Sequence, residues 1–269
     1  MKGAIDCWVN VNMGEQARIP FIQRVKEDYF HAGDEFVKSY SVEETLEAMD
    51  AAGVERAVIS IDGRRPDPKI LAFPERHPER FALAASHDVR SGMRGLRELE
   101  ALVRARPVVL VRLVPFLVDL PPNHRLYYPV YARCIELDVA VSVNTGIPGP
   151  PMPGECQNPM HLDRVCLDFP ELRLVMAHGA DPWWGEAIRL MLKYPNLHLM
   201  TSAYAPRHFP PELIHFMNTR GRDKILFASD HPVLPMERCT REAKALDLRE
   251  GVLERYLYEN AERVLFAEA

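Results

Sequence analysis

Eight short apolar runs, separated by helical patterns, restrict the possible folds of this chain more than any other feature. The runs are rich in Val, Ile, Leu and Ala and have the length of buried strands. They cover residues 4–11, 57–61, 81–86, 108–114, 139–143, 172–177, 197–201 and 225–228. Strands that are apolar on both faces and joined through helices form parallel sheets with both faces covered. Eight such units within about 250 residues predict an α/β fold, the (β/α)8 TIM barrel.

Amphipathic helical patterns fill most of the gaps between these runs. The clearest begins after Ser41, which forms a capping box with Glu44, and ends at Gly53. The others cover residues 95–104, 127–137, 161–166, 184–192, 211–219 and 253–266. An open doubly wound sheet is the alternative, but no glycine-rich phosphate loop follows the first strand. We therefore expect one domain over residues 1–269, with an insertion at about 12–40 after the first strand.

Composition limits the partners and the compartment. The chain is 47% hydrophobic and 26% charged, and its net charge of -5 comes without blocks of like charge. These values favour a small-molecule substrate and give no reason to expect nucleic acid or a membrane surface. Five scattered cysteines without a CxxC pair indicate a reducing, cytoplasmic location. The apolar runs are far shorter than the ~20 residues of a membrane helix.

Loop lengths indicate which end of the barrel carries a site. The turns before strands are short, whereas the loops after the first, fourth and fifth strands are long, at residues 12–40, 115–125 and 147–160. Long loops on a rigid scaffold are where binding groups gather. The third of these loops is rich in proline, so we expect it to form a fixed wall of a pocket; a surface insertion without function is the alternative.

Polar and aromatic side chains follow the predicted strands and would converge at the same rim. Any one of them could be a cap or a satisfied core residue, but several together favour a binding site. Aromatic side chains suit a flat ligand, such as a planar ring acid or a lactone. The candidates are Trp8, Asn10, Arg112, Asn144, His178, Trp183, Tyr204, Asp230 and His231.

Five segments carry a family resemblance. They are IDCWVN at 5–10, YYPVYARCIELDVAVSVNTG at 127–146, FPELRLVMAHGADPW at 169–183, ILFASDHP at 225–232 and ENAERVLF at 259–266. In this order they resemble the amidohydrolase superfamily, specifically the amidohydrolase-related group that includes aminocarboxymuconate semialdehyde decarboxylase and 2-pyrone-4,6-dicarboxylate lactonase. The resemblance implies a (β/α)8 barrel, a site at the carboxyl ends of its strands and often a homodimer.

The metal-binding pattern of that family is degraded here. The family's first strand reads IDxHxH, and its two histidines correspond to Trp8 and Asn10; the histidine of its HTG sequence corresponds to Asn144. Two functional positions remain, His178 and Asp230. Because a zinc site needs at least three His, Cys or carboxylate ligands, we expect no metal cofactor. The alternative is a remodelled site in which Asp230 and His178 hold a divalent ion, with Asn10 or His231.

The resemblance and the surviving residues together suggest a hydrolase, metal-independent, acting on an ester, lactone or amide of a small cyclic or aromatic carboxylate. Asp230 would be the general base, and His178 would polarise the carbonyl group or orient the water. Arg112 would either pair with a substrate carboxylate or brace an acid inside the barrel. Two alternatives stay open: a non-oxidative decarboxylase or lyase with a remodelled metal site, and a catalytically silent barrel that binds a small molecule.

Overall fold

A computed structural model describes residues 2–17 and 19–266 of the chain. Its eight strands form one parallel sheet in which each strand pairs with the next along the sequence. The strands are β1 (Ala4–Val9), β2 (Val54–Asp62), β3 (Phe81–Ser86), β4 (Val108–Leu113), β5 (Ala140–Asn144), β6 (Leu174–Ala177), β7 (Leu197–Met200) and β8 (Ile225–Leu226). A doubly wound sheet would reverse its strand order, so this order confirms the predicted barrel.

Backbone hydrogen bonds between the two ends of the sheet bring β8 and the segment after it against β1. The Cys7 N–H donates to the Phe227 carbonyl at 3.1 Å, and the Asp230 N–H donates to the Trp8 carbonyl at 3.0 Å. These bonds fix the first and last strand ends side by side. Residues that are more than two hundred positions apart in the sequence therefore share one rim.

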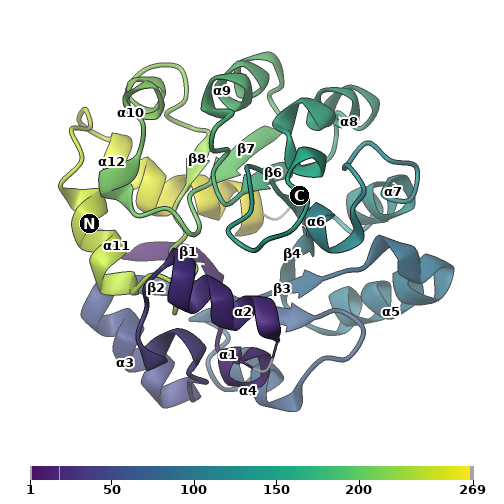
Figure 1. The fold of residues 1–269 in the computed structure, drawn as a ribbon, viewed down its shortest axis with the longest axis horizontal. Coiled ribbons are helices and arrows are strands. Elements are labelled where there is room, and N and C mark those ends of the chain that lie inside the picture. Colours follow the sequence, from purple (N-terminus) through teal and green to yellow (C-terminus); the bar gives the residue numbers. More distant parts are fainter. Residues whose placement is uncertain (1, 18, 267–269) are drawn as a thin grey trace.

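Helices surround the strands, as Figure 1 shows. The helix α3 begins after Ser41 and ends at Gly53, with both capping-box hydrogen bonds present, as the sequence predicts. The ring consists of α3 (Val42–Ala52), α4 (Pro68–Arg76), α5 (Gly92–Ala105), α7 (Tyr128–Glu136), α8 (Leu162–Asp168), α9 (Trp184–Lys193), α10 (Pro211–Met217) and α11 (Met236–Lys244). The C-terminal segment follows as α12 (Val252–Glu254) and the π-helical turns η7 (Arg255–Glu259) and η8 (Glu262–Phe266).

The sequence analysis did not predict α4 and α11. The helix α4 contains Pro74 and begins at Pro68, and prolines usually mark helix ends. The helix α11 buries Met236, Cys239 and Ala243 but is otherwise polar, so its apolar stripe is narrow. The first strand is also shorter than predicted, because it ends at Val9.

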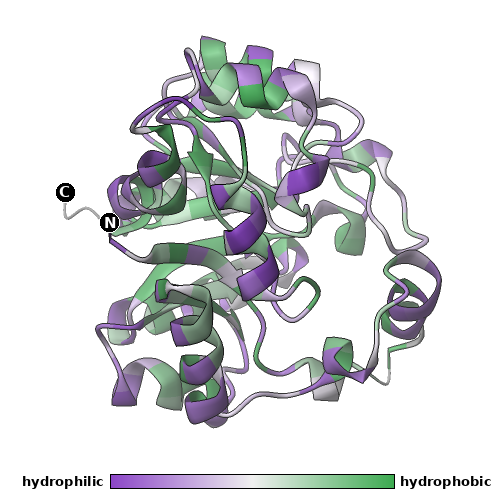
Figure 2. Ribbon diagram, turned by 90° about the vertical axis from the view of Figure 1, so that its left-hand side faces the viewer, coloured by the Kyte–Doolittle hydropathy of each residue, from purple (hydrophilic) through white to green (hydrophobic). Residues whose placement is uncertain are grey.

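The apolar core has two parts, one inside the barrel and one between the strands and the helices. Figure 2 shows hydrophobic strands in the interior and hydrophilic residues gathered on the surrounding helices. The five cysteines are free and buried, and they contribute to this packing. Among the described residues, no helix combines the length and apolar character that a membrane crossing requires.

The segment between β1 and α3 forms a cover with a small core of its own. It contains α1 (Met13–Gln16), α2 (Pro20–Arg24), the π-helical turn η1 (Val25–Tyr29) and the 3-10 turn η2 (Asp34–Val37). Met13, Val25 and Phe36 are buried together in it. An antiparallel bridge between Asn12 and Ser39 closes the base of the segment. In Figure 1, α2 lies in front of the inner strands.

Candidate active site

A cavity of about 290 Å³ lies at the carboxyl ends of the strands. Trp8 and Asn10 reach it from the end of β1, and His178 and Asp230 follow β6 and β8. The insertion after β1 and the proline-rich loop after β5 supply most of the remaining wall. The predicted wall at residues 147–160 is therefore present, with Ile147, Pro148, Gly149, Pro150 and Gln157 on the cavity.

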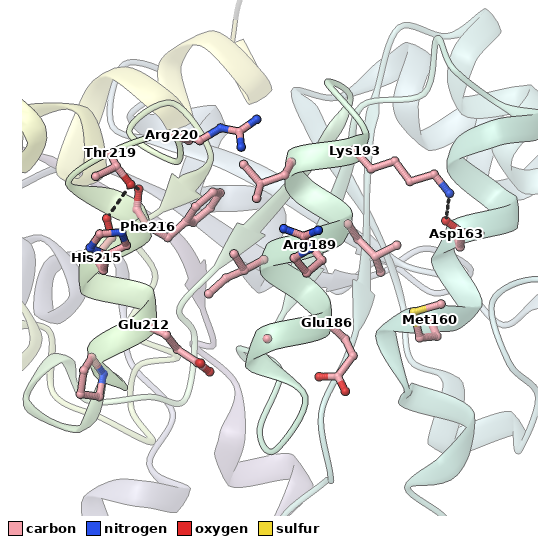
Figure 3. Close-up of a pocket in the computed structure, with 15 residues that line it drawn as sticks. Met160, Asp163, Glu186, Arg189, Lys193, Glu212, His215, Phe216, Thr219 and Arg220 are labelled. Atoms are coloured by element: carbon pink, nitrogen blue, oxygen red, sulfur yellow. Dashed lines mark hydrogen bonds and ion pairs between the residues drawn. The ribbon is translucent and has the colours of Figure 1, made fainter.

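A larger hollow of about 1350 Å³ lies elsewhere, on the outer surface around α9 and α10. Figure 3 shows that its side chains come from neighbouring helices, with an ion pair between Lys193 and Asp163 at one side. Its lining contains no strand-end residue from the set that the sequence singled out. The smaller cavity is therefore the candidate active site.

The Asp230 carboxyl group is fixed at the floor of this cavity. The amide Nδ2 of Asn10 donates to Asp230 Oδ1 at 2.8 Å, and Asn10 Oδ1 accepts from Ser60 Oγ at 2.6 Å. The two bonds define the orientation of the Asn10 amide. Burial raises the pKa of Asp230 to about 8, although the Asn10 hydrogen bond and the nearby Arg112 charge act in the opposite direction. Asp230 is therefore largely protonated at neutral pH.

His178 faces the same cavity as a neutral imidazole. Its ring lies against the Trp8 indole with ring centroids 4.3 Å apart, and its backbone N–H donates to Ser202 Oγ at 3.0 Å. Burial, and then the positive charge of Arg112, lower the pKa of His178 to about 4. Within the described part of the chain, its Nδ1 atom has no hydrogen-bond partner.

Three non-glycine residues on the cavity have left-handed backbone conformations. The φ angles are 65° at His178, 63° at Ala203 and 66° at Asp230. Such conformations are strained for residues with a Cβ atom and gather at functional sites. The backbone thus holds His178 and Asp230 at the cavity in strained conformations.

Arg112 lies beneath the cavity and does not line it. Its guanidinium group is 3.5 Å from the centroid of the Trp8 ring, and it donates to the Cys7 carbonyl at 3.0 Å and to Ser60 Oγ. Asp6 is also buried here, accepting hydrogen bonds from the backbone N–H groups of Ser229 and Trp8 at 2.9 and 3.2 Å. Asp6 therefore has a structural role, and Arg112 has the surroundings of a brace inside the barrel.

The remaining predicted residues divide into two sets. Asn144 and Tyr204 line the cavity, whereas Trp183 and His231 do not. Trp183 precedes α9 and is half-buried. The His231 ring is buried against Tyr40, with ring centroids 4.8 Å apart.

The sequence did not single out Gln157, nor the individual apolar side chains with which the insertion lines the cavity. Gln157 is buried on the cavity, and its Nε2 donates to the Gly146 carbonyl at 2.8 Å. Phe21, Ile22 and Phe30 belong to a segment that gave no clear periodicity in the sequence. Their number in a loop after a strand was the available signal, because exposed loops seldom carry so many apolar side chains.

The sequence profile of the amidohydrolase family matches residues 5–267, so the chain belongs to this family. No curated protein sequence matches the chain significantly. Among solved structures, an uncharacterised TIM-barrel protein from Bordetella bronchiseptica is similar over 97% of this chain and 98% of that one, with 26% identity and a TM-score of 0.78.

Two other solved structures share the fold at lower identity. A dihydroxybenzoic acid decarboxylase from Polaromonas, with bound manganese and the inhibitor 2-nitroresorcinol, has 16% identity and a TM-score of 0.69 over 98% of this chain and 97% of that one. A protein described as a probable 2-pyrone-4,6-dicarboxylic acid hydrolase, from Acinetobacter baumannii with bound citric acid, has 17% identity and a TM-score of 0.65 over 98% of this chain and 99% of that one. The similar structures thus include both a lyase and a hydrolase.

The manganese in the Polaromonas enzyme contradicts our expectation of no metal cofactor, which is corrected accordingly. The loss of the family's histidines at Trp8 and Asn10 was not a sufficient basis for that expectation. In the described residues, however, no group of three or more His, Cys, Asp or Glu could hold a metal ion. The Asn10 amide is already engaged, and the buried Arg112 cation would repel a second cation nearby. The described residues present here therefore do not fit a metal ion.

Proposed function

We propose that the protein is a hydrolase that cleaves an ester, lactone or amide bond in a small cyclic compound. The observation that carries this proposal is that a buried carboxyl group and a neutral imidazole, Asp230 and His178, line one cavity. Asn10 holds one carboxyl oxygen and leaves the other for a water molecule. A carboxylate whose pKa lies near the working pH is well matched to general-base catalysis.

The reaction needs no oxidant or reductant. Asp230 takes a proton from water while the water oxygen bonds to the substrate's carbonyl carbon, and the carbonyl oxygen gains the negative charge. The neutral His178 ring donates an N–H hydrogen bond to that oxygen, as neutral imidazoles do in other enzymes. The bond to the leaving oxygen or nitrogen then breaks, and this atom receives the proton from Asp230.

A decarboxylase is the second candidate, and the raised pKa of Asp230 is the observation in its favour. At neutral pH the protonated Asp230 could deliver its proton to a ring carbon as the bond to the carboxylate breaks and carbon dioxide leaves. The solved structures of similar fold include such an enzyme. The hydrolase is preferred because the described wall offers no cationic side chain for a carboxylate substrate.

The pH dependence separates the two candidates. Hydrolysis requires ionised Asp230, so kcat/KM should rise with pH and level off above the pKa of about 8. Decarboxylation requires the protonated form, so its rate should fall over the same interval. The two assays are ester or lactone cleavage by the purified protein and carbon dioxide release from 2,6-dihydroxybenzoate.

Two substitutions test the assigned residues. Asp230→Asn and His178→Gln should each lower kcat of the hydrolysis at least about 100-fold, because each removes a group that acts on the reacting atoms. Asp62→Asn is the matched control, since Asp62 ends β2 at the same rim but is exposed and does not line the cavity. Unchanged hydrolysis in Asp230→Asn would contradict the proposal.

A further inference from the structure

The wall of the candidate active site is largely apolar and aromatic. The insertion contributes Phe21, Val25, Phe30 and Phe36, and the loop after β4 contributes Phe116. Such walls bind flat, apolar rings by removing their surface from water. The ring of a substrate therefore has a large contact surface in this cavity.

The polar groups that line the same cavity are uncharged, apart from Asp230, which is largely protonated at neutral pH. Asn144, Thr145 and Gln157 present amide and hydroxyl groups, and His178 is a neutral imidazole. Asp230 is the one carboxyl group among the described residues on the wall, and that wall contains no Lys or Arg. These groups can hydrogen-bond a carbonyl or hydroxyl of a substrate, but none of them neutralises a substrate carboxylate.

The buried Arg112 cation does not line the cavity. Arg112 is 2% exposed, lies against the Trp8 indole and directs two of its nitrogens to the Cys7 carbonyl and Ser60 Oγ. The buried Asp6 carboxylate interacts with the Arg112 charge from within the barrel. The Arg112 side chain therefore makes no direct ion pair with a ligand in the cavity, because it does not line the cavity and packs against Trp8, which does.

A substrate carboxylate would enter this cavity without a partner. An ion that leaves water for an enclosed apolar site is strongly disfavoured unless an opposite charge or several hydrogen bonds compensate it. A neutral ring of the same shape makes the same apolar contacts with the wall and avoids the cost of removing a charge from water. When Asp230 is ionised, it further disfavours a substrate carboxylate relative to a neutral ring, because like charges repel.

We propose that the site selects uncharged cyclic esters or lactones and excludes their carboxylated analogues. This selectivity rests on the hydrolase proposed above and narrows its substrate class. It differs from the carboxylated compounds for which the similar solved enzymes are named.

Binding measurements test the selectivity separately from catalysis. Coumarin and coumarin-3-carboxylate are titrated into the full-length protein by isothermal titration calorimetry, once with added manganese chloride and once with EDTA. We expect coumarin to bind at least about 100-fold more tightly than its carboxylate under both conditions, a difference of about 2.8 kcal/mol. Equal or tighter binding of the carboxylate would overturn the proposal, as would the absence of binding by either probe.

A turnover assay tests the proposed hydrolase activity separately from the proposed selectivity. Phenyl acetate and 4-carboxyphenyl acetate are compared by their kcat/KM values. Preferred cleavage of phenyl acetate supports both proposals, whereas preference for the carboxylated ester overturns the selectivity. Selective binding of coumarin without cleavage of either ester would overturn the hydrolase and leave the selectivity standing.

Three variants locate the charge effect. Leu117 lines the cavity and is 50% exposed, so Leu117→Arg can place a cation at the rim with little disturbance. We expect Leu117→Arg to tighten binding of coumarin-3-carboxylate at least about tenfold relative to Leu117→Gln, which removes the same apolar side chain without adding charge.

Arg18 lies outside the described residues, so Arg18→Ala is measured as well. A strong affinity for the carboxylate that disappears in Arg18→Ala would assign the cation to that residue and overturn the proposal.

Discussion

Replacing Asp230 by asparagine tests whether the folded protein holds this carboxyl group in its neutral form. Burial raises the pKa of Asp230 from 3.8 to about 8. The difference is about four pH units, and each corresponds to about 1.36 kcal/mol. The ionised carboxylate therefore costs the folded protein about 6 kcal/mol at pH 8 and above.

The direction of the pH effect follows from the protons bound in each state. Between about pH 4 and pH 8 the folded protein keeps the Asp230 proton, whereas the unfolded chain has released it. This contribution to the free energy of unfolding is therefore complete below pH 4 and is lost as the pH rises to 8. Asparagine has the shape of the protonated acid and keeps an oxygen that can accept from Asn10. Asp230→Asn should thus match the wild type near pH 4 and exceed its stability increasingly toward pH 8.

Urea unfolding followed by circular dichroism between pH 5 and pH 9 measures this difference. Subtracting the wild-type curve from the variant curve removes the titration of the other buried groups. Asp247→Asn is the control, because it removes a carboxyl group that is exposed and does not line the cavity. A difference for Asp230→Asn that does not change with pH would refute the raised pKa and with it the assigned pH profile of catalysis.

Three further substitutions test packing and hydrogen bonding at residues that do not line the cavity. A Cβ atom at Gly179 would lie 2.5 Å from the Trp184 ring, and the φ angle there is 67°, so Gly179→Ala should lower the free energy of unfolding by about 2 to 4 kcal/mol. A Cβ atom at Gly185 meets nothing within 4 Å, so Gly185→Ala should leave the free energy of unfolding unchanged or raise it. Equal effects of the two glycine substitutions in urea unfolding would contradict the steric argument. Ser229→Ala removes the hydroxyl donor to buried Asp6 and should lower the free energy of unfolding at pH 7 by about 1 to 3 kcal/mol. An unchanged urea midpoint would mean that other donors satisfy the carboxyl group.

Local patterns predicted the elements that have strong periodicity or clear caps. The barrel strands and α3 follow from apolar runs and from the capping box at Ser41 and Glu44. The helices α4 and α11 were not predictable in this way. Their prolines and narrow apolar faces are stabilised by packing on the barrel, which is a tertiary effect.

The position of a residue at a strand end was enough to find part of the site. His178, Asp230 and Asn10 share the cavity, because parallel strands bring their carboxyl ends to one rim. Trp183 and His231 have the same kind of position in the sequence but lie outside the cavity wall. The direction of a side chain after a strand depends on local backbone angles and packing, which the sequence pattern does not specify.

By itself, the sequence determined that this is a (β/α)8 barrel of the amidohydrolase kind and that its polar side chains gather at one end. Apolar periodicity and chain connectivity suffice for this, because they act along the chain. Only the tertiary structure decided that Arg112 lies under Trp8, that Asp230 is buried enough to hold its proton at neutral pH, and that the wall is largely uncharged. Burial and charge compensation depend on residues that meet across the barrel from distant parts of the chain, and no local pattern encodes them.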